Sequence, residues 1–288
     1  MALVAPAGPL SGESDLQRAI DSTRAFGWEP IVGEHVRSKD GYLAGSDAER
    51  LADLNQAAAD DSIDAVWCIR GGYGAMRLLD AIDYEAWCRR PKALIGFSDI
   101  TALHAAIGAR AELVTFHGPT ARASLTDFCK SSLREAVACD GPLVLSAPSG
   151  KALRPGRARG RLVGGNLALL AGMAGTPFAP SYDDAILVLE DVNESVYRLD
   201  RMLTQLRLNG ALSNLAGLVL GQFTDIPEDS SNEDRPLSEL LDELAGWCGV
   251  PCLANAPVGH VTDIWTVPLG ATAELDVDER TLNVVRSP

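Results

Sequence analysis

Short apolar runs alternate with amphipathic segments along the first part of the chain. The apolar runs predict buried strands, and apolar positions that recur at helical spacing predict helices with one buried face. The expected strands are Ala2–Ala5, Glu29–Val36, Ala65–Ile69, Ala93–Ile95 and Leu113–Phe116. The expected helices are Ser14–Phe26, Asp47–Asp60, Ala75–Leu79 and a helix that follows Ser98 and ends at Gly108. This alternation predicts an α/β fold with a doubly wound parallel sheet.

The composition changes over Gly141–Gly160, which is rich in proline, glycine and serine. We expect residues 141–160 to form a linker between an N-terminal domain, 1–140, and a C-terminal domain, 161–288. The segments expected in the second domain are helix Leu167–Ala174, strand Ala185–Leu189, helix Val196–Leu208, strand Leu215–Gly221, acidic loop Asp225–Asp234, helix Leu237–Trp247, strand Cys252–Ala254 and two closing strands within Trp265–Val285.

Ser98 falls on a sharp turn, because Gly96-Phe97 ends the strand at Ala93–Ile95 and a helix begins just after the serine. That position suits a nucleophile, since the helix N-terminus offers free N–H groups to a developing negative charge. It equally suits a helix cap, with Asp99 in the first helical turn. In parallel sheets ligands gather at the carboxyl ends of strands, where Ser98 and His117 are both expected.

A serine nucleophile needs a base and an acid that orients it. The four histidines are His35, His104, His117 and His260. His104 lies on a helix where a packed role is favoured, whereas His260 follows Gly259 in a loop rich in turn residues, where a base is well placed. The candidates for the orienting acid are Glu190, Asp191 and Asp263, and their spacing does not choose between them.

The glycines of Arg70–Gly74 follow a strand but match neither the dinucleotide nor the phosphate-loop motif. We interpret the loop as part of an oxyanion hole, formed by the N–H groups of Gly72 and Asp99. Since no metal-ligand spacing is visible either, we expect neither a metal nor a cofactor.

The chain carries 25 basic and 39 acidic residues, a formal net charge of −14. This balance argues against nucleic acid and anionic membranes as partners. The six cysteines are scattered without a C-x-x-C pair, which is typical of reduced thiols. We see no signal peptide and no apolar run of membrane-spanning length, so we expect a cytoplasmic protein.

Several motifs together resemble those of the LD-carboxypeptidase family, in order and over nearly the whole chain. They are Gly71-Gly72-Tyr73-Gly74 with Arg77-Leu78-Leu79, Ile95-Gly96-Phe97-Ser98-Asp99-Ile100-Thr101, His117-Gly118-Pro119, Gly164-Gly165-Asn166-Leu167, Leu189-Glu190-Asp191 with Tyr197-Arg198-Leu199-Asp200-Arg201, and Gly259-His260. The resemblance implies a flavodoxin-like N-terminal domain, a smaller C-terminal α/β domain and a homodimer.

The same resemblance implies a Ser–Glu–His triad on Ser98, Glu190 and His260, with the oxyanion hole on Gly72 and Asp99. Members of the family hydrolyse the bond between diaminopimelate and terminal D-alanine in cytoplasmic muropeptides during cell-wall recycling. For substrate binding we expect contacts from Gly71, Tyr73, His117 and Asn166.

Two alternatives stay open. A related branch of the family cleaves microcin-C-type peptidyl nucleotides and confers self-immunity, but its members tend to be longer than this compact chain. A non-catalytic module that binds a small ligand at the strand edge is the other alternative.

Overall fold

The computed structural model describes residues 1–227 and 235–285, which fall into two compact units. Unit 1 comprises residues 1–139 with 265–268, and unit 2 comprises residues 140–264 with the chain from Leu269 onward. The second unit is about as long as the first, whereas a smaller C-terminal domain was expected. Most of the acidic loop expected over Asp225–Asp234 lies outside the described residues.

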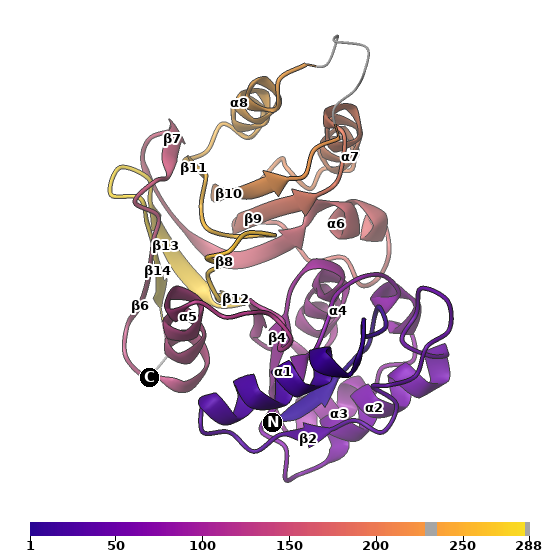
Figure 1. The fold of residues 1–288 in the computed structure, drawn as a ribbon. Coiled ribbons are helices and arrows are strands. Elements are labelled where there is room, and N and C mark those ends of the chain that lie inside the picture. Colours follow the sequence, from indigo (N-terminus) through magenta and orange to yellow (C-terminus); the bar gives the residue numbers. More distant parts are fainter. Residues whose placement is uncertain (228–234, 286–288) are drawn as a thin grey trace. The chain divides into compact units, whose positions relative to one another are not determined.

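Unit 1 is built on a six-stranded sheet with the order β2-β1-β3-β4-β5-β12 (Figure 1). Its strands are β1 (Ala2–Val4), β2 (Ile31–Val32), β3 (Ala65–Cys68), β4 (Ala93–Gly96), β5 (Thr115–His117) and β12 (Val267–Leu269). Neighbouring strands from β1 to β5 run parallel. The order β2-β1-β3-β4-β5 is the flavodoxin-like arrangement of a doubly wound sheet. The predicted α/β fold is therefore confirmed.

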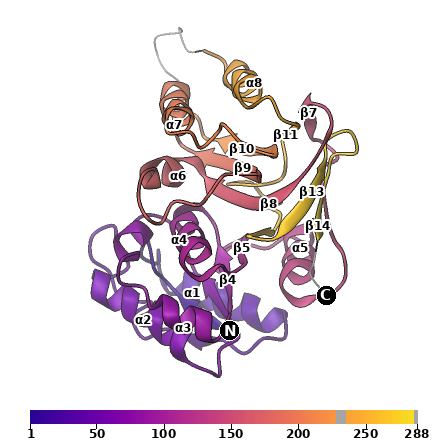
Figure 2. The ribbon, with the colours of Figure 1, turned by 180° about the vertical axis from the view of Figure 1, so that it is seen from behind.

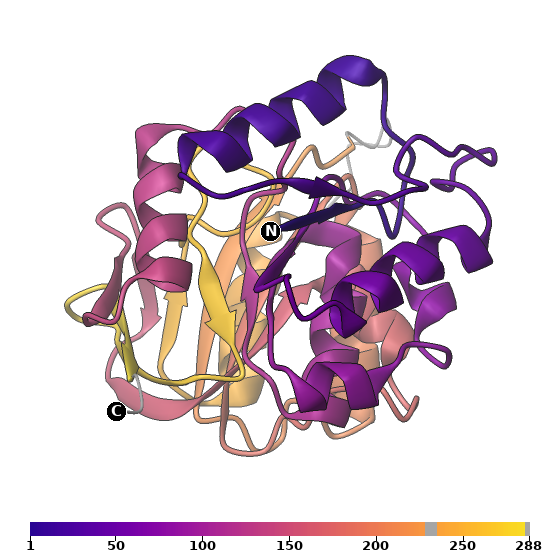
Figure 3. The same cartoon turned by 90° about the horizontal axis from the view of Figure 1, so that it is seen from below.

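Helices cover both faces of this sheet (Figure 3). They are α1 (Glu13–Ala25), α2 (Asp47–Ala59), α3 (Tyr84–Arg89), α4 (Thr101–Ala111) and α5 (Asp127–Ala138), with the short 3₁₀ turns η1 (Ala75–Leu78) and η2 (Ser98–Ile100). Leu16 of α1 and Leu133 of α5 pack in one apolar cluster with Trp67 of β3. Helices α2, α3 and α4 lie on the opposite face (Figures 1 and 3).

Several elements of unit 1 differ from the sequence-based expectation. The expected helix Ala75–Leu79 is the 3₁₀ turn η1, the expected strand Glu29–Val36 is reduced to β2, and α3 was not predicted. Helix α4 continues past Gly108 and ends at Ala111. The next residue, Glu112, caps it with a left-handed φ of 55°. Helix α5 was not predicted, although Thr126 caps it by accepting a hydrogen bond from the N–H of Cys129 at 3.2 Å. Its buried positions keep helical spacing, but two of the four are serine and alanine, so the stripe lacks the large apolar residues that mark the predicted helices.

Unit 2 is built on an eight-stranded mixed sheet with the order β6-β14-β13-β8-β9-β10-β11-β7. Its strands are β6 (Leu143–Ser146), β7 (Lys151–Arg154), β8 (Arg157–Asn166), β9 (Ala185–Val192), β10 (Gly217–Thr224), β11 (Cys252–Ala254), β13 (Thr272–Asp276) and β14 (Thr281–Val285). Strands β8 to β11 are parallel, and the outer strands pair antiparallel.

Residues 141–160, expected to form a linker, instead hold β6, β7 and the start of β8. Strands β6 and β7 are the two edges of the sheet, and edge strands carry many exposed polar side chains. Both strands are only four residues long and lie between segments rich in glycine, proline and serine, which is why the short apolar run Leu143–Leu145 was not recognised as a strand.

Three helices pack on the parallel strands of unit 2 (Figure 2): α6 (Leu167–Met173), α7 (Val196–Leu208) and α8 (Leu237–Cys248). Leucines of these helices share one buried cluster with Leu187 of β9 and Leu218 of β10. This packing fixes β9, whose carboxyl end carries Glu190. Within the described residues, no helix is both long and apolar enough to cross a membrane.

Candidate active site

Ser98 lies on the predicted turn between β4 and α4, and its backbone is strained. Phe97 is extended, Ser98 has a φ of 64°, and Thr101 begins α4. A left-handed conformation costs a non-glycine residue on the order of 1–3 kcal/mol, so it persists only where the surrounding structure imposes it. A strained serine between a strand and a helix is typical of the nucleophile of α/β-hydrolases.

The glycine loop Gly71–Gly74, which follows β3, lies directly against this turn. A Cβ atom at Gly71 would lie 3.0 Å from the Ser98 Cβ and 3.3 Å from its Oγ. A Cβ atom at Gly72, whose φ is 115°, would lie 3.0 Å from the Cα of Gly8. Because glycine is needed for such close approach, main-chain atoms rather than side chains line this side of Ser98.

In unit 2, Glu190 and His260 form a hydrogen-bonded pair. The His260 Nδ1 lies 2.9 Å from Glu190 Oε2, and the histidine side chain is 23% exposed while the glutamate is fully buried. A Cβ at Gly259 would lie 2.9 Å from the same carboxylate oxygen, so only glycine lets the His260 loop come this close. With Nδ1–H donating to the carboxylate, the neutral imidazole carries its basic lone pair on Nε2.

The structure distinguishes between the three acids that spacing left open. Successive residues of a strand point to opposite faces, so Glu190 and Asp191 of β9 cannot both face His260. Glu190 makes the contact, Asp191 is buried against α6, and Asp263 is exposed on a loop.

Asp191 holds the start of α6 in place. Its Oδ2 accepts a hydrogen bond from the N–H of Ala168 at 2.9 Å, and its Oδ1 accepts one from Asn166 Nδ2 at 3.0 Å. Burial, with a further contribution from the nearby charge of Glu190, raises the pKa of Asp191 to about 6. Asn166 in turn caps α6, since its Oδ1 accepts a hydrogen bond from the N–H of Leu169 at 3.3 Å.

The raised pKa of Asp191 has a testable consequence for stability. A group whose pKa is raised on folding stabilises the protein below its ordinary pKa of 3.8, and this contribution is lost as the pH rises through about 6. Relative to Asp191→Asn, the natural protein should therefore lose up to about 2–3 kcal/mol of unfolding free energy between pH 4 and pH 7. Urea unfolding of both proteins across this range measures the difference, and a difference that does not change with pH would contradict the prediction.

Two histidines of unit 1, His104 and His117, occupy interior positions. His117, at the end of β5, is fully buried and meets the Phe97 ring edge-on at 6.0 Å between centroids. The Nε2 of His104 lies 2.8 Å from the carbonyl oxygen of Gly96, and burial lowers the pKa of this histidine to about 4. His104 is therefore neutral at physiological pH.

Tyr73 projects from the glycine loop and forms an exposed pair with a residue that the sequence did not single out. Its side chain is 56% exposed, that of Tyr42 is 68% exposed, and the two rings meet edge-on at 5.4 Å between centroids. No local signal marks Tyr42, because it lies on a different loop, far from Tyr73 in the chain.

The expected site residues thus form two groups, each within one unit. Unit 1 brings together Ser98, Asp99 and the glycine loop, and unit 2 brings together Glu190 and His260. Among the residues that the structure describes, no group of three or more His, Cys, Asp or Glu side chains could hold a metal ion.

Comparison with known families accounts for both units. Residues 1–118 match the LD-carboxypeptidase N-terminal domain, and residues 159–275 match the LD-carboxypeptidase C-terminal domain. The chain belongs to the LD-carboxypeptidase family. The family assignment that the sequence motifs predicted is confirmed, and the protein is a hydrolase of the peptidase class.

Three relatives illustrate the range of the LD-carboxypeptidase family. The murein tetrapeptide carboxypeptidase of Pseudomonas aeruginosa is 35% identical over 294 residues, which cover 96% of this chain and 92% of that protein. The crystal structure of muramoyltetrapeptide carboxypeptidase from Oxalobacter formigenes matches with a TM-score of 0.88 and 30% identity, over 100% of this chain and 99% of that one. The microcin C7 self-immunity protein MccF of Escherichia coli is 27% identical over 300 residues, covering 93% of this chain and 87% of that protein.

Proposed function

We propose that this LD-carboxypeptidase removes the terminal D-alanine from muropeptides by a serine mechanism, cleaving the L,D-peptide bond that follows diaminopimelate. The observation that carries the proposal is the strained Ser98 turn against the glycine loop, in a chain whose relatives include a murein tetrapeptide carboxypeptidase. The hydrogen-bonded Glu190–His260 pair supports it, because a serine nucleophile needs an oriented base.

In the first half of the proposed reaction, Ser98 becomes acylated. The Nε2 atom of His260 takes the proton from Ser98 Oγ as Oγ attacks the scissile carbonyl carbon. Glu190 accepts the hydrogen bond from Nδ1 and stabilises the imidazolium that forms. The N–H groups of Gly72 and Asp99 stabilise the negative oxygen of the tetrahedral intermediate. The carbon–nitrogen bond then breaks, and the amine of D-alanine leaves with the proton from His260.

In the second half, water releases the acyl group. His260 takes a proton from the water as its oxygen attacks the ester carbonyl carbon, and the same amides hold the second oxyanion. The ester bond breaks, Ser98 Oγ regains the proton from His260, and the shortened peptide leaves with a new carboxylate.

For substrate contacts we propose the main chain of Gly71 and the exposed ring of Tyr73, joined by Tyr42. The buried side chains of His117 and Asn166 are proposed to shape the site from within their units. Cytoplasmic recycling and a homodimeric assembly, which the family resemblance implies, stay predictions.

Product analysis tests the proposed function. We expect the enzyme to release D-alanine from a muropeptide tetrapeptide that ends in diaminopimelate–D-alanine, detected by chromatography of the products. A matched tetrapeptide that ends in L-alanine should not be cleaved. Equal cleavage of both peptides would contradict the L,D specificity, and the absence of any product would favour a non-catalytic binding module.

The second candidate is the hydrolysis of peptidyl nucleotides, which the similarity to MccF favours. An aminoacyl sulfamoyl adenosine, the class of ligand named for one solved MccF structure, is the appropriate second substrate in the same assay. Faster turnover of this substrate than of the tetrapeptide would favour self-immunity over muropeptide processing.

A further inference from the structure

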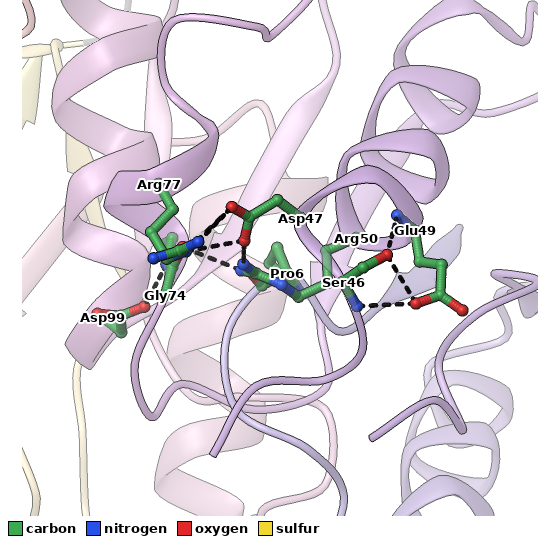
Figure 4. Close-up of polar contacts among 9 residues, drawn as sticks. Pro6, Ser46, Asp47, Glu49, Arg50, Gly74, Arg77 and Asp99 are labelled. Carbon is green, nitrogen blue, oxygen red and sulfur yellow. Dashed lines mark hydrogen bonds and ion pairs between the residues drawn. The ribbon is translucent and has the colours of Figure 1, made fainter. Parts of the chain in front are cut away.

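Arg50, in the first turn of α2, is a buried cation next to the glycine loop (Figure 4). Its side chain is 0% exposed. Its Nη1 donates to the carbonyl oxygen of Pro6 at 2.5 Å and to that of Gly74 at 2.9 Å, and its Nη2 pairs with Asp47. Because the guanidinium is shielded from solvent and, besides Asp47, binds main-chain carbonyls of two neighbouring loops, it is placed to hold these loops rather than to bind substrate.

The surroundings keep Arg50 in one position. Asp47 is also bound by Arg77, whose Nη2 donates to Asp47 Oδ2 at 2.7 Å (Figure 4). A capping box fixes the start of α2: the Ser46 N–H donates to Glu49 Oε2 at 2.7 Å, and the Glu49 N–H donates to Ser46 Oγ at 3.3 Å. The guanidinium therefore has little freedom to follow a displaced loop.

Asp99 holds the same loop from the opposite side. It follows Ser98 directly, is buried, and its Oδ2 accepts a hydrogen bond from the N–H of Ala75 at 2.7 Å (Figure 4). Two adjacent residues at the end of the loop, Gly74 and Ala75, are thus bound by two different elements, α2 and the Ser98 turn.

We propose that Arg50 and Asp99 are positioning residues that hold the glycine loop so that the Gly72 N–H is aimed at the oxyanion formed next to Ser98. The inference rests on the serine mechanism proposed above. At the end of the loop, Arg50 binds the carbonyl oxygen of Gly74 and Asp99 binds the N–H of Ala75. Loss of either contact lets the loop shift, and a misplacement of about 1 Å can cost on the order of 100-fold in rate.

If Arg50 served only to stabilise the fold, its replacement would leave the kcat of the folded enzyme unchanged. Buried ion pairs are often replaceable by apolar side chains of similar volume at little cost in stability. In Arg50→Met, Asp47 keeps its contact with Arg77, and the buried Asp99, which loses the nearby charge of Arg50, keeps its hydrogen bond from Ala75. We therefore expect this variant to fold but to carry a misplaced loop.

The experiment compares matched variants of the full chain on the tetrapeptide. Arg50→Met and Asp99→Leu are each expected to lower kcat by about 10–100-fold with KM changed less than about twofold, because the oxyanion forms only during reaction. Arg50→Lys and Asp99→Asn should recover most of the activity, since the lysine can still donate to one carbonyl and the asparagine can still accept from Ala75. The control is Asp53→Asn, also on α2, which should keep the natural kcat because the Asp53 carboxylate binds the N–H and Nδ1 of His35 rather than the glycine loop.

Two further measurements separate positioning from folding and from the mechanism itself. In the inactive Ser98→Ala background, adding Arg50→Met should change the affinity for the tetrapeptide by less than about twofold. In the active enzyme, the double variant Arg50→Met, Asp99→Leu should lose less kcat than the product of the two single losses, because both residues act on one loop. Unchanged kcat, a change in KM alone, or a loss matched by the unfolded fraction would overturn the inference. Activity retained by Ser98→Ala would instead overturn the serine mechanism on which it rests.

Discussion

The Ser98→Ala variant is expected to lose on the order of 10⁴–10⁶-fold in kcat, because without the hydroxyl no acyl-enzyme forms and only binding and oxyanion stabilisation remain. Substrate affinity should change little, since the hydroxyl contributes mainly to the chemical step. Single-turnover measurement of D-alanine release from the tetrapeptide determines the loss. A variant that kept more than about a tenth of the natural rate would mean that Ser98 is not the nucleophile.

The strain at Ser98 provides a control that separates activity from stability. Glycine adopts a φ of 64° without penalty, whereas alanine does not. Ser98→Gly should therefore be as inactive as Ser98→Ala but more stable, by about 0.4–1 kcal/mol in urea unfolding after allowing for the greater flexibility of glycine in the unfolded chain. If glycine proves the less stable of the two, the turn is not strained in the natural protein.

Loss of His260 is expected to be nearly as severe as loss of Ser98, because the two act in the same proton transfer. His260→Ala should lower kcat by on the order of 10⁴–10⁶-fold, and the double variant Ser98→Ala, His260→Ala should be no slower than Ser98→Ala alone. Glu190→Gln should cost less, about 10²–10⁴-fold, because the imidazole survives but loses its charged partner. A complete double-variant cycle on the tetrapeptide measures these values.

The double-variant cycle can also contradict the proposed roles of His260 and Glu190. If the losses of Ser98→Ala and His260→Ala multiply, the two residues act independently, and His260 is then a substrate contact rather than the base. A Glu190→Gln variant as active as the natural protein would leave the Glu190–His260 pair with a structural role only.

The central strands of both sheets were predictable because they are buried on both faces and therefore form continuous apolar runs, such as Ala65–Cys68 and Ala185–Leu189. The edge strands β6 and β7 were not. Each has only four residues and is bounded by glycine, proline and serine, so the surrounding turn residues made the whole segment resemble a linker.

Within the candidate site, the residues found most directly are those whose role depends on the local chain. Ser98 and the glycine loop could be assigned to turns from the residues on either side of them. The choice of Glu190 over Asp191 came from family resemblance, and only the direction of each side chain on β9 gives it a physical reason. Arg50 and Tyr42 carry no signal in their own segments.

The sequence by itself determined the alternation of strands and helices, the turn that carries Ser98 and the glycine-rich turn that follows the strand at Ala65–Ile69. These features depend on the conformational preferences of neighbouring residues, which act over a few positions. The tertiary structure alone decided which distant groups meet: the side chains of His260 and Glu190, 70 residues apart, and the Arg50 guanidinium with the Gly74 carbonyl, 24 residues apart. Such contacts depend on strand order, on the side of the strand each residue occupies and on the close packing of loops, and hydrophobic periodicity specifies none of these.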